Sequence, residues 1–347
     1  MTTAKCITAE KLKALGRIWA PAAKVAVVSH MNPDGDAVGA CAAMSSFLRE
    51  VLGKKDVTVV LPDAPGEPLS FVSSLIPSIV VGRNDIAAAE KAIGEADAVF
   101  VLDLNRLNRT SVLEQAVRRS GARKVLIDHH PGPEEDPFEL VFSDVNVSSA
   151  CELLYQILTA ILGGAAALPA DCAKTLMCGM TTDTNNFANS VFPSTLRMAS
   201  ELIEAGVDRD AVVTSLFQSY RVNRIRLMGY MLDRCLRITP EGAAWMLLTK
   251  EIKEMFDFRD GETEGFVNIP LASKDIRLSI FLTEEEDRIR VSVRSKKGTS
   301  ARQITERFFN GGGHENASGG RLMIPEDIPG IEAVGAYVEN ALKQSLS

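Results

Sequence analysis

The sequence predicts an α/β protein that begins with a parallel sheet and ends with a second, smaller α/β domain. Three short apolar runs have the composition of buried parallel strands: Val25–Val28, Ala98–Leu102 and Val125–Ile127. A helix-like segment stands before or after each run, and this alternation is typical of a parallel sheet. The 347 residues also correspond to two domains of ordinary size.

The other elements of the first part follow from the same patterns. Val57–Leu61 is a further apolar run and is predicted to be a strand. Apolar residues at helical spacing predict helices at Ala37–Val51, Val112–Arg119, Ser148–Leu162, Ala170–Met180, Thr195–Ala205 and Asp210–Ser219.

The pattern changes near Arg221. Apolar residues recur at helical spacing up to Leu236, which predicts a long helix connecting two domains. Beyond it we expect strands at Ala244–Leu248, Ile276–Leu282 and Ile289–Val293, the last two forming a hairpin, then a helix at Ala301–Phe308, a glycine-rich loop, a strand at Arg321–Ile324 and a terminal helix. The predicted domains are therefore residues 1–220 and 239–347, joined by a helix over 221–238.

The charge distribution limits the partners. The formal net charge is −7, and the part from Arg221 onward is neutral, so the first part carries the whole excess. Proteins that grip long duplex DNA by its phosphates usually have a basic excess. We therefore expect no duplex DNA partner, whereas a short anionic substrate in a local site is compatible with this charge.

The cysteines and the hydropathy of the sequence indicate the cellular compartment of the protein. The six cysteines form no CxxC pair and mostly stand among apolar residues, which predicts buried free thiols in a reducing compartment. No apolar run approaches the roughly 20 residues that span a bilayer, and the first residues lack the order of a secretory signal. We expect a cytoplasmic protein with no membrane partner. The sequence leaves a homodimer open.

Polar clusters directly follow the predicted strands. His30, Asp34 and Asp36 come after the first strand, in a segment whose Pro33 and Gly35 allow a sharp turn. Ligand sites of parallel sheets lie beyond the carboxyl ends of the strands, where one imidazole and two carboxylates can converge on a cation. The alternative is a turn that only caps the following helix.

Three further segments place potential ligands in the same way. Asp103 follows the strand Ala98–Leu102, where a buried carboxylate needs a partner or a metal. Asp128, His129 and His130 follow the next strand, and Asp183 follows an apolar helix. Each of these residues could be an ordinary turn or cap residue. With the segment after the first strand, however, four segments place potential ligands in this way, and chance explains such a pattern poorly.

Together these side chains predict a site for two divalent cations. Its clustered carboxylates would repel one another without bound cations. Carboxylate oxygens and imidazole nitrogens favour Mn²⁺, with Mg²⁺ or Co²⁺ as alternatives and zinc less suited to so many carboxylates.

A glycine-rich segment in the second part indicates an anion site. Residues 311–320 read GGGHENASGG, and tandem glycines let backbone N–H groups approach a phosphate closely. A helix starting near Asn316 would add a favourable dipole. His314 and Arg294 are candidate donors to a phosphate oxygen. The alternative is a flexible loop before a strand.

These motifs, in this order and over nearly the whole chain, resemble the DHH/DHHA1 phosphoesterase family. The resemblance implies that His30 and Asp34 bind one metal ion and that Asp36, His129 and Asp183 bind a second, with Asp103 bridging them. It implies that His130 faces the scissile phosphate and that Asp128 supports it. Substrate contacts are implied for Arg109, Arg294, Ser295, Gly312, Gly313 and His314. The family often has glycine where Asn185 and Asn186 stand, so this chain departs from the family pattern next to Asp183.

The resemblance also implies a substrate class. The length and layout are most similar to members that degrade short single-stranded RNA to mononucleotides and remove the 3′-phosphate of 3′-phosphoadenosine 5′-phosphate (pAp). In such a reaction, hydroxide from a water shared by the two metal ions attacks phosphorus in line with the leaving oxygen. Rival substrates are cyclic or linear dinucleotides and polyphosphate. A different class, a catalytically silent nucleotide-binding regulator, is disfavoured because all six metal-ligand positions hold competent residues.

Overall fold

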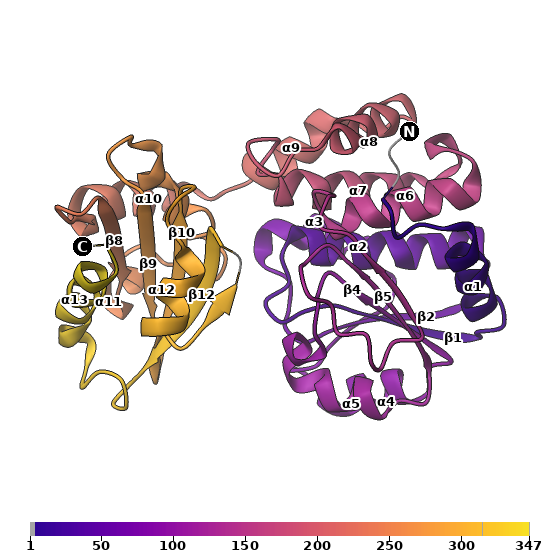
Figure 1. Cartoon of the computed structure of the whole chain (residues 1–347), viewed down its shortest axis with the longest axis horizontal. Coiled ribbons are helices and arrows are strands. Elements are labelled where there is room, and N and C mark those ends of the chain that lie inside the picture. The colour runs from indigo at the N-terminus through magenta and orange to yellow at the C-terminus, as the bar shows by residue number, and fades with distance from the viewer. Residues whose placement is uncertain (1–3, 314, 347) are drawn as a thin grey trace. The chain divides into compact units, whose positions relative to one another are not determined.

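A computed structural model describes residues 4–313 and 315–346, which divide into two compact units, Met1–Ser219 and Tyr220–Ser347. The first unit is built on a six-stranded, wholly parallel sheet in the order β3-β2-β1-β4-β5-β6 (Figure 1). Its strands are β1 (Lys24–Val28), β2 (Asp56–Leu61), β3 (Ile79–Val81), β4 (Ala98–Leu102), β5 (Arg123–Asp128) and β6 (Leu140–Ser143). The predicted α/β class and parallel sheet are confirmed.

Helices cover both faces of this sheet (Figure 1). One face carries the larger core, in which Trp19, Phe47 and Phe100 pack together. Next to the sheet on this side lie α1 (Ala9–Trp19), α2 (Gly35–Ser46) and α6 (Ala150–Leu162). On α2 pack α3 (Ser70–Ser73) and α7 (Ala170–Asp183), and on α7 pack α8 (Pro193–Glu204) and α9 (Arg209–Phe217). The other face is covered by α4 (Ile86–Gly94) and α5 (Glu114–Arg119). Because β4 is covered on both faces, all five of its side chains are buried, which explains its unbroken apolar run.

The strand order reverses beside β1, since β2 follows on one side and β4 on the other. Crevices at the carboxyl ends of strands open at such a switch point. The register pairs Val28 with Val101, and Leu102 with Ile127, so β1, β4 and β5 end nearly level. The residues that follow these three strands are therefore brought together.

The second unit has its own six-stranded sheet, in the order β11-β12-β10-β9-β8-β7. Only β8 and β9 pair in parallel. The strands are β7 (Arg237–Ile238), β8 (Ala243–Leu248), β9 (Leu278–Glu284), β10 (Arg288–Ser295), β11 (Gly312–Gly313) and β12 (Ala317–Met323). The helices are α10 (Val222–Tyr230), α11 (Lys250–Met255), α12 (Ala301–Phe308) and α13 (Val334–Leu346).

Short helical turns join these elements. Two are wide turns that continue an α-helix, Phe47–Val51 after α2 and Met231–Cys235 after α10. The helical segment expected over 221–238 thus consists of α10 and the second wide turn, and it lies within the second unit. Among the described residues, no helix is long and apolar enough to cross a membrane. The six cysteines are free thiols.

One expectation for the second unit is wrong. The prediction is a glycine-rich loop before a short strand at Arg321–Ile324, with a helix start near Asn316 as an aid to anion binding, but Gly312–Gly313 and Ala317–Met323 pair as antiparallel strands and no helix starts at Asn316. The glycines permit this pairing because a Cβ at Gly311 would collide with the carbonyl of Gly319. The close pairing depends on the absence of a side chain at the glycines. Hydrophobic periodicity cannot detect strands of this kind, because it registers only apolar side chains.

Candidate metal centre

The first group of potential ligands comes from β1, the following loop and β4. His30 Nε2 lies 3.3 Å from Asp103 Oδ2 and 3.8 Å from Asp34 Oδ1. His30 Nδ1 lies 2.8 Å from the carbonyl oxygen of Met31, which orients the ring so that Nε2 faces the two carboxylates. Asp34 is also the N-cap of α2, because its Oδ1 accepts hydrogen bonds from the backbone of Asp36 and Ala37.

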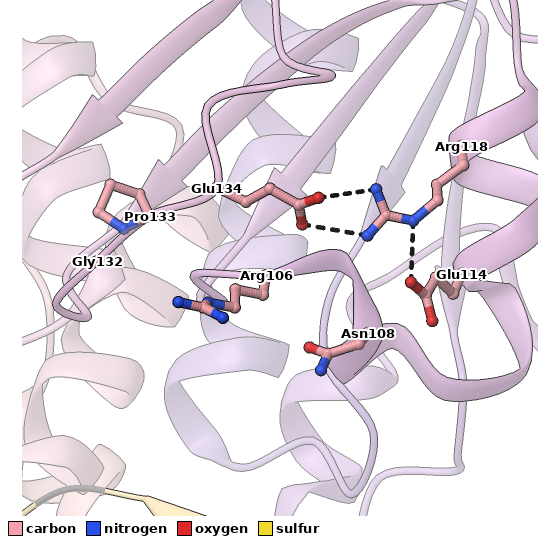
Figure 2. A pocket seen from close by; sticks show the side chains of 7 residues that line it. All are labelled: Arg106, Asn108, Glu114, Arg118, Gly132, Pro133 and Glu134. Atoms are coloured by element: carbon pink, nitrogen blue, oxygen red, sulfur yellow. Dashed lines mark hydrogen bonds and ion pairs between the residues drawn. The ribbon is translucent and has the colours of Figure 1, made fainter.

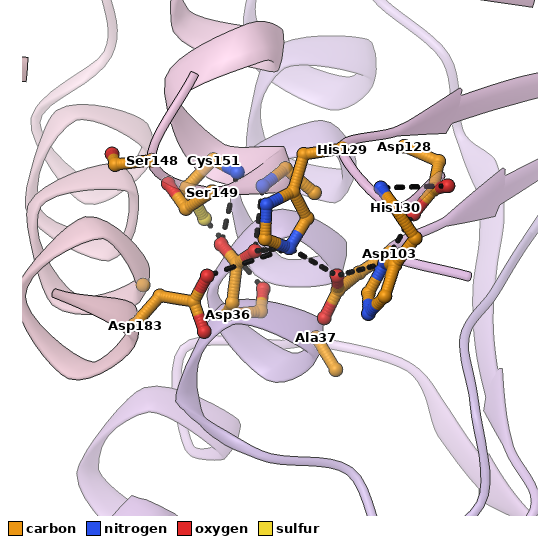
Figure 3. Close-up of polar contacts among 12 residues, drawn as sticks. Asp36, Ala37, Asp103, Asp128, His129, His130, Ser148, Ser149, Cys151 and Asp183 are labelled. Carbon is orange, nitrogen blue, oxygen red and sulfur yellow. Dashed lines mark hydrogen bonds and ion pairs between the residues drawn. The ribbon is translucent and has the colours of Figure 1, made fainter. Parts of the chain in front are cut away.

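A second group surrounds His129 (Figure 3). His129 Nε2 lies 3.4 Å from Asp103 Oδ1, 3.4 Å from Asp183 Oδ2 and 3.9 Å from Asp36 Oδ2. These three carboxylates come from the residue after β4, the last residue of α7 and the first turn of α2. Asp103 faces both His30 and His129, so it connects the two groups.

Charge and burial perturb the whole cluster. Burial alone lowers the pKa of His30, but Asp103 and Asp34 outweigh it and raise this pKa to about 9. Burial is likewise outweighed at His129, where Asp103 and Asp183 raise the pKa to about 10. Burial raises the pKa of Asp103, but His129 and His30 bring it well below its ordinary value. The two imidazoles therefore supply the positive charge that the carboxylates require.

At two further carboxylates, His129 lowers the pKa but does not outweigh burial and the neighbouring negative charges. Burial, reinforced by the Asp103 carboxylate, raises the pKa of Asp36 to about 7. Burial and the nearby Asp36 raise the pKa of Asp183 well above its ordinary value. The mutual repulsion of these groups is the electrostatic signature of a cation site.

The donor set fits divalent cations. His30, Asp34 and Asp103 bring one ligand atom each to within 4.8 Å of the others, and so do Asp36, His129 and Asp183. Asp103 Oδ1 is buried, and among the described residues it accepts no hydrogen bond. A buried carboxylate oxygen without a donor is costly, whereas a cation would satisfy it. Carboxylate and imidazole donors suit Mn²⁺ and Mg²⁺.

The backbone at Asp103 has an unusual conformation. Its φ is +58°, in the left-handed region that Asp and Asn tolerate better than most residues. This turn ends β4 and directs the carboxylate toward the neighbouring strand ends. Its N–H still donates to the carbonyl of Ile127 over 3.0 Å, so the ladder to β5 continues up to the site.

His130 lies between Asp128 and Arg109. His130 Nδ1 is 2.7 Å from Asp128 Oδ1, and Asp128 Oδ2 also accepts the backbone N–H of His130 over 3.0 Å. Arg109 Nη1 lies 3.1 Å from His130 Nε2. The carbonyl of Arg109 accepts the N–H of Met31 over 2.8 Å, which ties the arginine to the loop of His30.

The N-terminus of α6 is a component of the site that the sequence did not reveal. The backbone N–H groups of Ala150 and Cys151 donate to the Asp36 carboxylate over 2.6 and 2.9 Å. Ser149 caps this helix and accepts the N–H of Glu152. The predicted helix Ser148–Leu162 already locates this helix start to within two residues, but nothing in the sequence indicates its contact with Asp36.

The expected substrate residues of the second unit lie at the β10–β12 end of its sheet. Arg294 is largely buried and donates to the carbonyls of Val293 and Ser318, and burial lowers its pKa. Asn316 Nδ2 donates to Ser295 Oγ over 2.9 Å. Gly312 and Gly313 form β11, and His314 lies outside the described residues.

Comparisons with known proteins place this arrangement in a family. The model described as "DHH family, N-terminal domain" matches residues 24–180, and the "DHHA1 domain" model matches residues 248–339. The chain belongs to the DHH/DHHA1 phosphoesterases, and it is a hydrolase that acts on phosphoester bonds.

Two curated relatives and one solved structure are similar to this chain over almost its whole length. The chain is 29% identical to a bifunctional oligoribonuclease and PAP phosphatase NrnA of Bacillus subtilis, over 88% of this chain and 91% of the relative. It is 27% identical to the protein of the same description from Thermus thermophilus, over 98% of this chain and 94% of that relative. A solved structure of an exopolyphosphatase-related protein from Bacteroides fragilis is 34% identical, covers 98% of this chain and 97% of its own, and superposes with a TM-score of 0.88.

Proposed function

We propose that this chain hydrolyses short single-stranded RNA oligonucleotides to mononucleotides and removes the 3′-phosphate of pAp to leave AMP. The observation that carries the proposal is the position of Asp103 between two groups of ligand atoms. Paired cations are a recurring device for attack on phosphorus. The relatives from Bacillus subtilis and Thermus thermophilus, which are similar over most of the chain, are described with both activities.

Each metal ion has its own set of ligands in this proposal. His30 and Asp34 would hold one ion, and Asp36, His129 and Asp183 would hold the other. Asp103 would be shared by both ions, since one of its oxygens faces His30 and the other faces His129. The mixed donors favour Mn²⁺, with Mg²⁺ or Co²⁺ as alternatives. Bound ions would activate a water molecule at neutral pH and neutralise charge on the phosphoryl oxygens.

The remaining side chains orient the substrate. His130 faces the scissile phosphate, and Asp128 holds its ring through Nδ1. Arg109 can grip a phosphate oxygen with its planar guanidinium, so an arriving phosphate competes with His130 for the same N–H donor.

We assign substrate recognition at the far end of the nucleotide to the second unit, through Arg294, Ser295, Gly312, Gly313 and His314. The pairing of β12 with β10 and β11, and the hydrogen bond from the N–H of Ser295 to the carbonyl of Asn316 over 3.0 Å, support a fixed backbone for Arg294, Ser295, Gly312 and Gly313. The domain limits proposed for these roles remain 1–220 for metal binding and 239–347 for substrate binding, with 221–238 between them.

The free thiols and the net charge support a compartment and a type of substrate. The six free thiols support a reducing compartment, and we propose the cytoplasm. The net charge of −7 supports a short RNA or a small nucleotide, rather than long duplex DNA, as the partner.

The test is hydrolysis of a labelled RNA trinucleotide with Mn²⁺, run beside pAp, a cyclic dinucleotide and polyphosphate. Release of mononucleotides together with conversion of pAp to AMP is the expected result. Inert RNA and pAp, with rapid turnover of another substrate, would overturn the substrate assignment and leave the metal centre in place. Activity that is unaffected by removal of divalent ions with EDTA would overturn the metal assignment.

Polyphosphate is the second candidate substrate. The relative from Bacteroides fragilis, at 34% identity, is described as exopolyphosphatase-related. Its inclusion in the same assay separates the two functions, because a polyphosphatase releases inorganic phosphate from a chain that carries no nucleoside.

A further inference from the structure

A cavity of about 480 Å³ lies beside the two segments that lead away from the metal cluster in the first unit (Figure 2). One segment follows Asp103, and the other follows His130. The volume is within the range of about 300–1,000 Å³ that is usual for small-molecule sites. The cavity is lined by Arg106, Asn108, Glu114, Arg118, Gly132, Pro133 and Glu134.

The wall formed by α5 is held by paired charges. Arg118 donates to Glu134 over 2.8 and 3.3 Å, and from Nε to Glu114 over 2.9 Å. Glu134 also accepts the N–H of Leu107 over 3.0 Å, which joins the two segments. Asn105 joins them again, because its carbonyl accepts the N–H of Glu134 over 2.7 Å. The cavity is therefore fixed before any ligand arrives.

Two lining side chains are left for a ligand. Arg106 and Asn108 are exposed, and among the described residues their side chains form no hydrogen bond or ion pair. Figure 2 shows the Arg106 guanidinium between the Gly132–Pro133 turn and Asn108. Arg118, by contrast, already has three hydrogen bonds to carboxylates.

The chemistry of the lining favours a nucleobase over a phosphate. Two arginines and two glutamates give the lining no net charge, and an anion would meet Glu114 and Glu134. A neutral aromatic ring meets no such repulsion. A guanidinium plane stacks on bases, an asparagine amide can hydrogen-bond to a base edge, and Pro133 offers an apolar surface.

We propose that this cavity binds the base of the nucleoside that short RNA has and pAp lacks. The proposal rests on the proposed function. In a dinucleotide the scissile phosphate joins two nucleosides, whereas pAp has only the one whose 3′-oxygen leaves. The additional nucleoside is attached to phosphorus through its 5′-oxygen. Arg106 stands three residues before Arg109, which contacts His130, and the Gly132–Pro133 turn begins two residues after His130, so the cavity adjoins the phosphate position.

The test compares steady-state kinetics on the ribonucleotide pApA and on pAp, with saturating Mn²⁺. Arg106→Ala and Asn108→Ala are expected to raise KM for pApA, by about tenfold for Arg106→Ala, as the loss of a base-stacking partner does. Both variants should turn over pAp within about twofold of the original protein. Arg119→Ala is the matched control, because Arg119 is an exposed arginine of α5 outside the cavity lining.

A second substrate isolates the base itself. A dinucleotide whose 3′ residue is abasic should bind the original protein at least as weakly as pApA binds Arg106→Ala, and Arg106→Ala should weaken it no further. Sensitivity of the abasic substrate to Arg106→Ala would overturn the base contact. Equal losses on pApA and pAp, or no loss on either, would also overturn it. An original protein that cleaves neither pApA nor pAp refutes the proposed function instead.

Discussion

The guanidinium of Arg109 donates a hydrogen bond from Nη1 to Nε2 of His130 over 3.1 Å. Arginine has no acceptor, so His130 Nε2 must present its lone pair and the ring proton must be on Nδ1. Nδ1 then donates to Asp128 Oδ1 over 2.7 Å. The two neighbours therefore select the same neutral tautomer from opposite sides of the ring.

Replacing Asp128 with asparagine should set the two neighbours of the ring against each other. When the amide oxygen keeps the hydrogen bond from the His130 backbone N–H, the amide N–H faces Nδ1 and favours a proton on Nε2, where Arg109 also donates. We expect kcat on both RNA and pAp to fall by at least about 100-fold, as a wrong tautomer does in other His–Asp pairs. The measurement is steady-state kinetics together with ¹⁵N NMR of the histidine rings.

Arg109→Ala provides the comparison, because Asp128 still holds the Nδ1–H tautomer in that variant. It should lose the arginine's contribution to phosphate binding, seen mainly in KM, and keep the NMR signature of the tautomer. An Asp128→Asn variant with unchanged kcat would show that the tautomer does not limit the reaction.

Asp103→Asn tests the bridge between the two ligand groups. Asparagine tolerates the left-handed φ of +58° at this position and fills the same volume, so the fold should survive. A neutral amide is a poor bridging ligand, and we expect turnover to be abolished and Mn²⁺ affinity to fall by more than about 100-fold, beyond the 10–100-fold typical of groups that only support a ligand. Calorimetric Mn²⁺ titration measures the affinity, and circular dichroism checks the fold. Normal Mn²⁺ binding would contradict the bridging role.

Most residues of the candidate metal centre could be predicted from the sequence, because each follows an apolar run whose end is visible in the sequence itself. Ala98–Leu102 has the predicted limits, and the residues after β1, β4 and β5 meet because parallel strands end at one edge. The strands β3 and β6, at the two edges of the sheet, were missed because their apolar runs of three residues are too short to be told from apolar residues in a loop.

Contacts between distant segments could not be predicted. The hydrogen bonds from the start of α6 to Asp36 join residues more than 100 positions apart. The departure from the family at Asn185 and Asn186 has a local explanation in the structure. Their φ values are +47° and +56°, and asparagine is one of the few side chains that tolerates the conformation glycine otherwise supplies.

The raised pKa values of His30 and His129, about 9 and 10, predict how pH acts on metal binding. With these pKa values, both rings are in the imidazolium form at pH 7, with a proton on each nitrogen. An imidazolium has no lone pair for a metal ion. Mn²⁺ must displace these protons, so its affinity should rise between pH 7 and 9. Calorimetry in two buffers of different ionisation enthalpy should detect net proton release. Binding without proton release would contradict the raised pKa values.

The same groups set the stability of the metal-free protein. A histidine whose pKa is raised in the folded state stabilises it below the unfolded pKa of about 6.5, and this contribution is lost as pH rises through the folded pKa. The free energy of unfolding of EDTA-treated protein should therefore fall from pH 7 to 9.5. Excess Mn²⁺ should oppose this fall, because the deprotonated imidazoles are then bound. Urea denaturation at the two pH values, with and without Mn²⁺, measures both effects.

Gly179 controls the distance between α7 and the Asp36 carboxylate. A Cβ at this position would collide with Cys151 Sγ and lie 2.8 Å from Asp36 Oδ1. Gly179→Ala should push α7 away from α2, lower the free energy of unfolding by about 1–3 kcal/mol as overpacking does, and weaken Mn²⁺ binding. Gly16→Ala is the matched control, because no atom lies within 4 Å of a Cβ at that α1 position. It should stabilise the protein by about 0.5–1 kcal/mol and leave Mn²⁺ affinity unchanged. Urea denaturation and Mn²⁺ titration of the two variants decide the matter, and equal Mn²⁺ affinities would refute a role for Gly179 in placing Asp36.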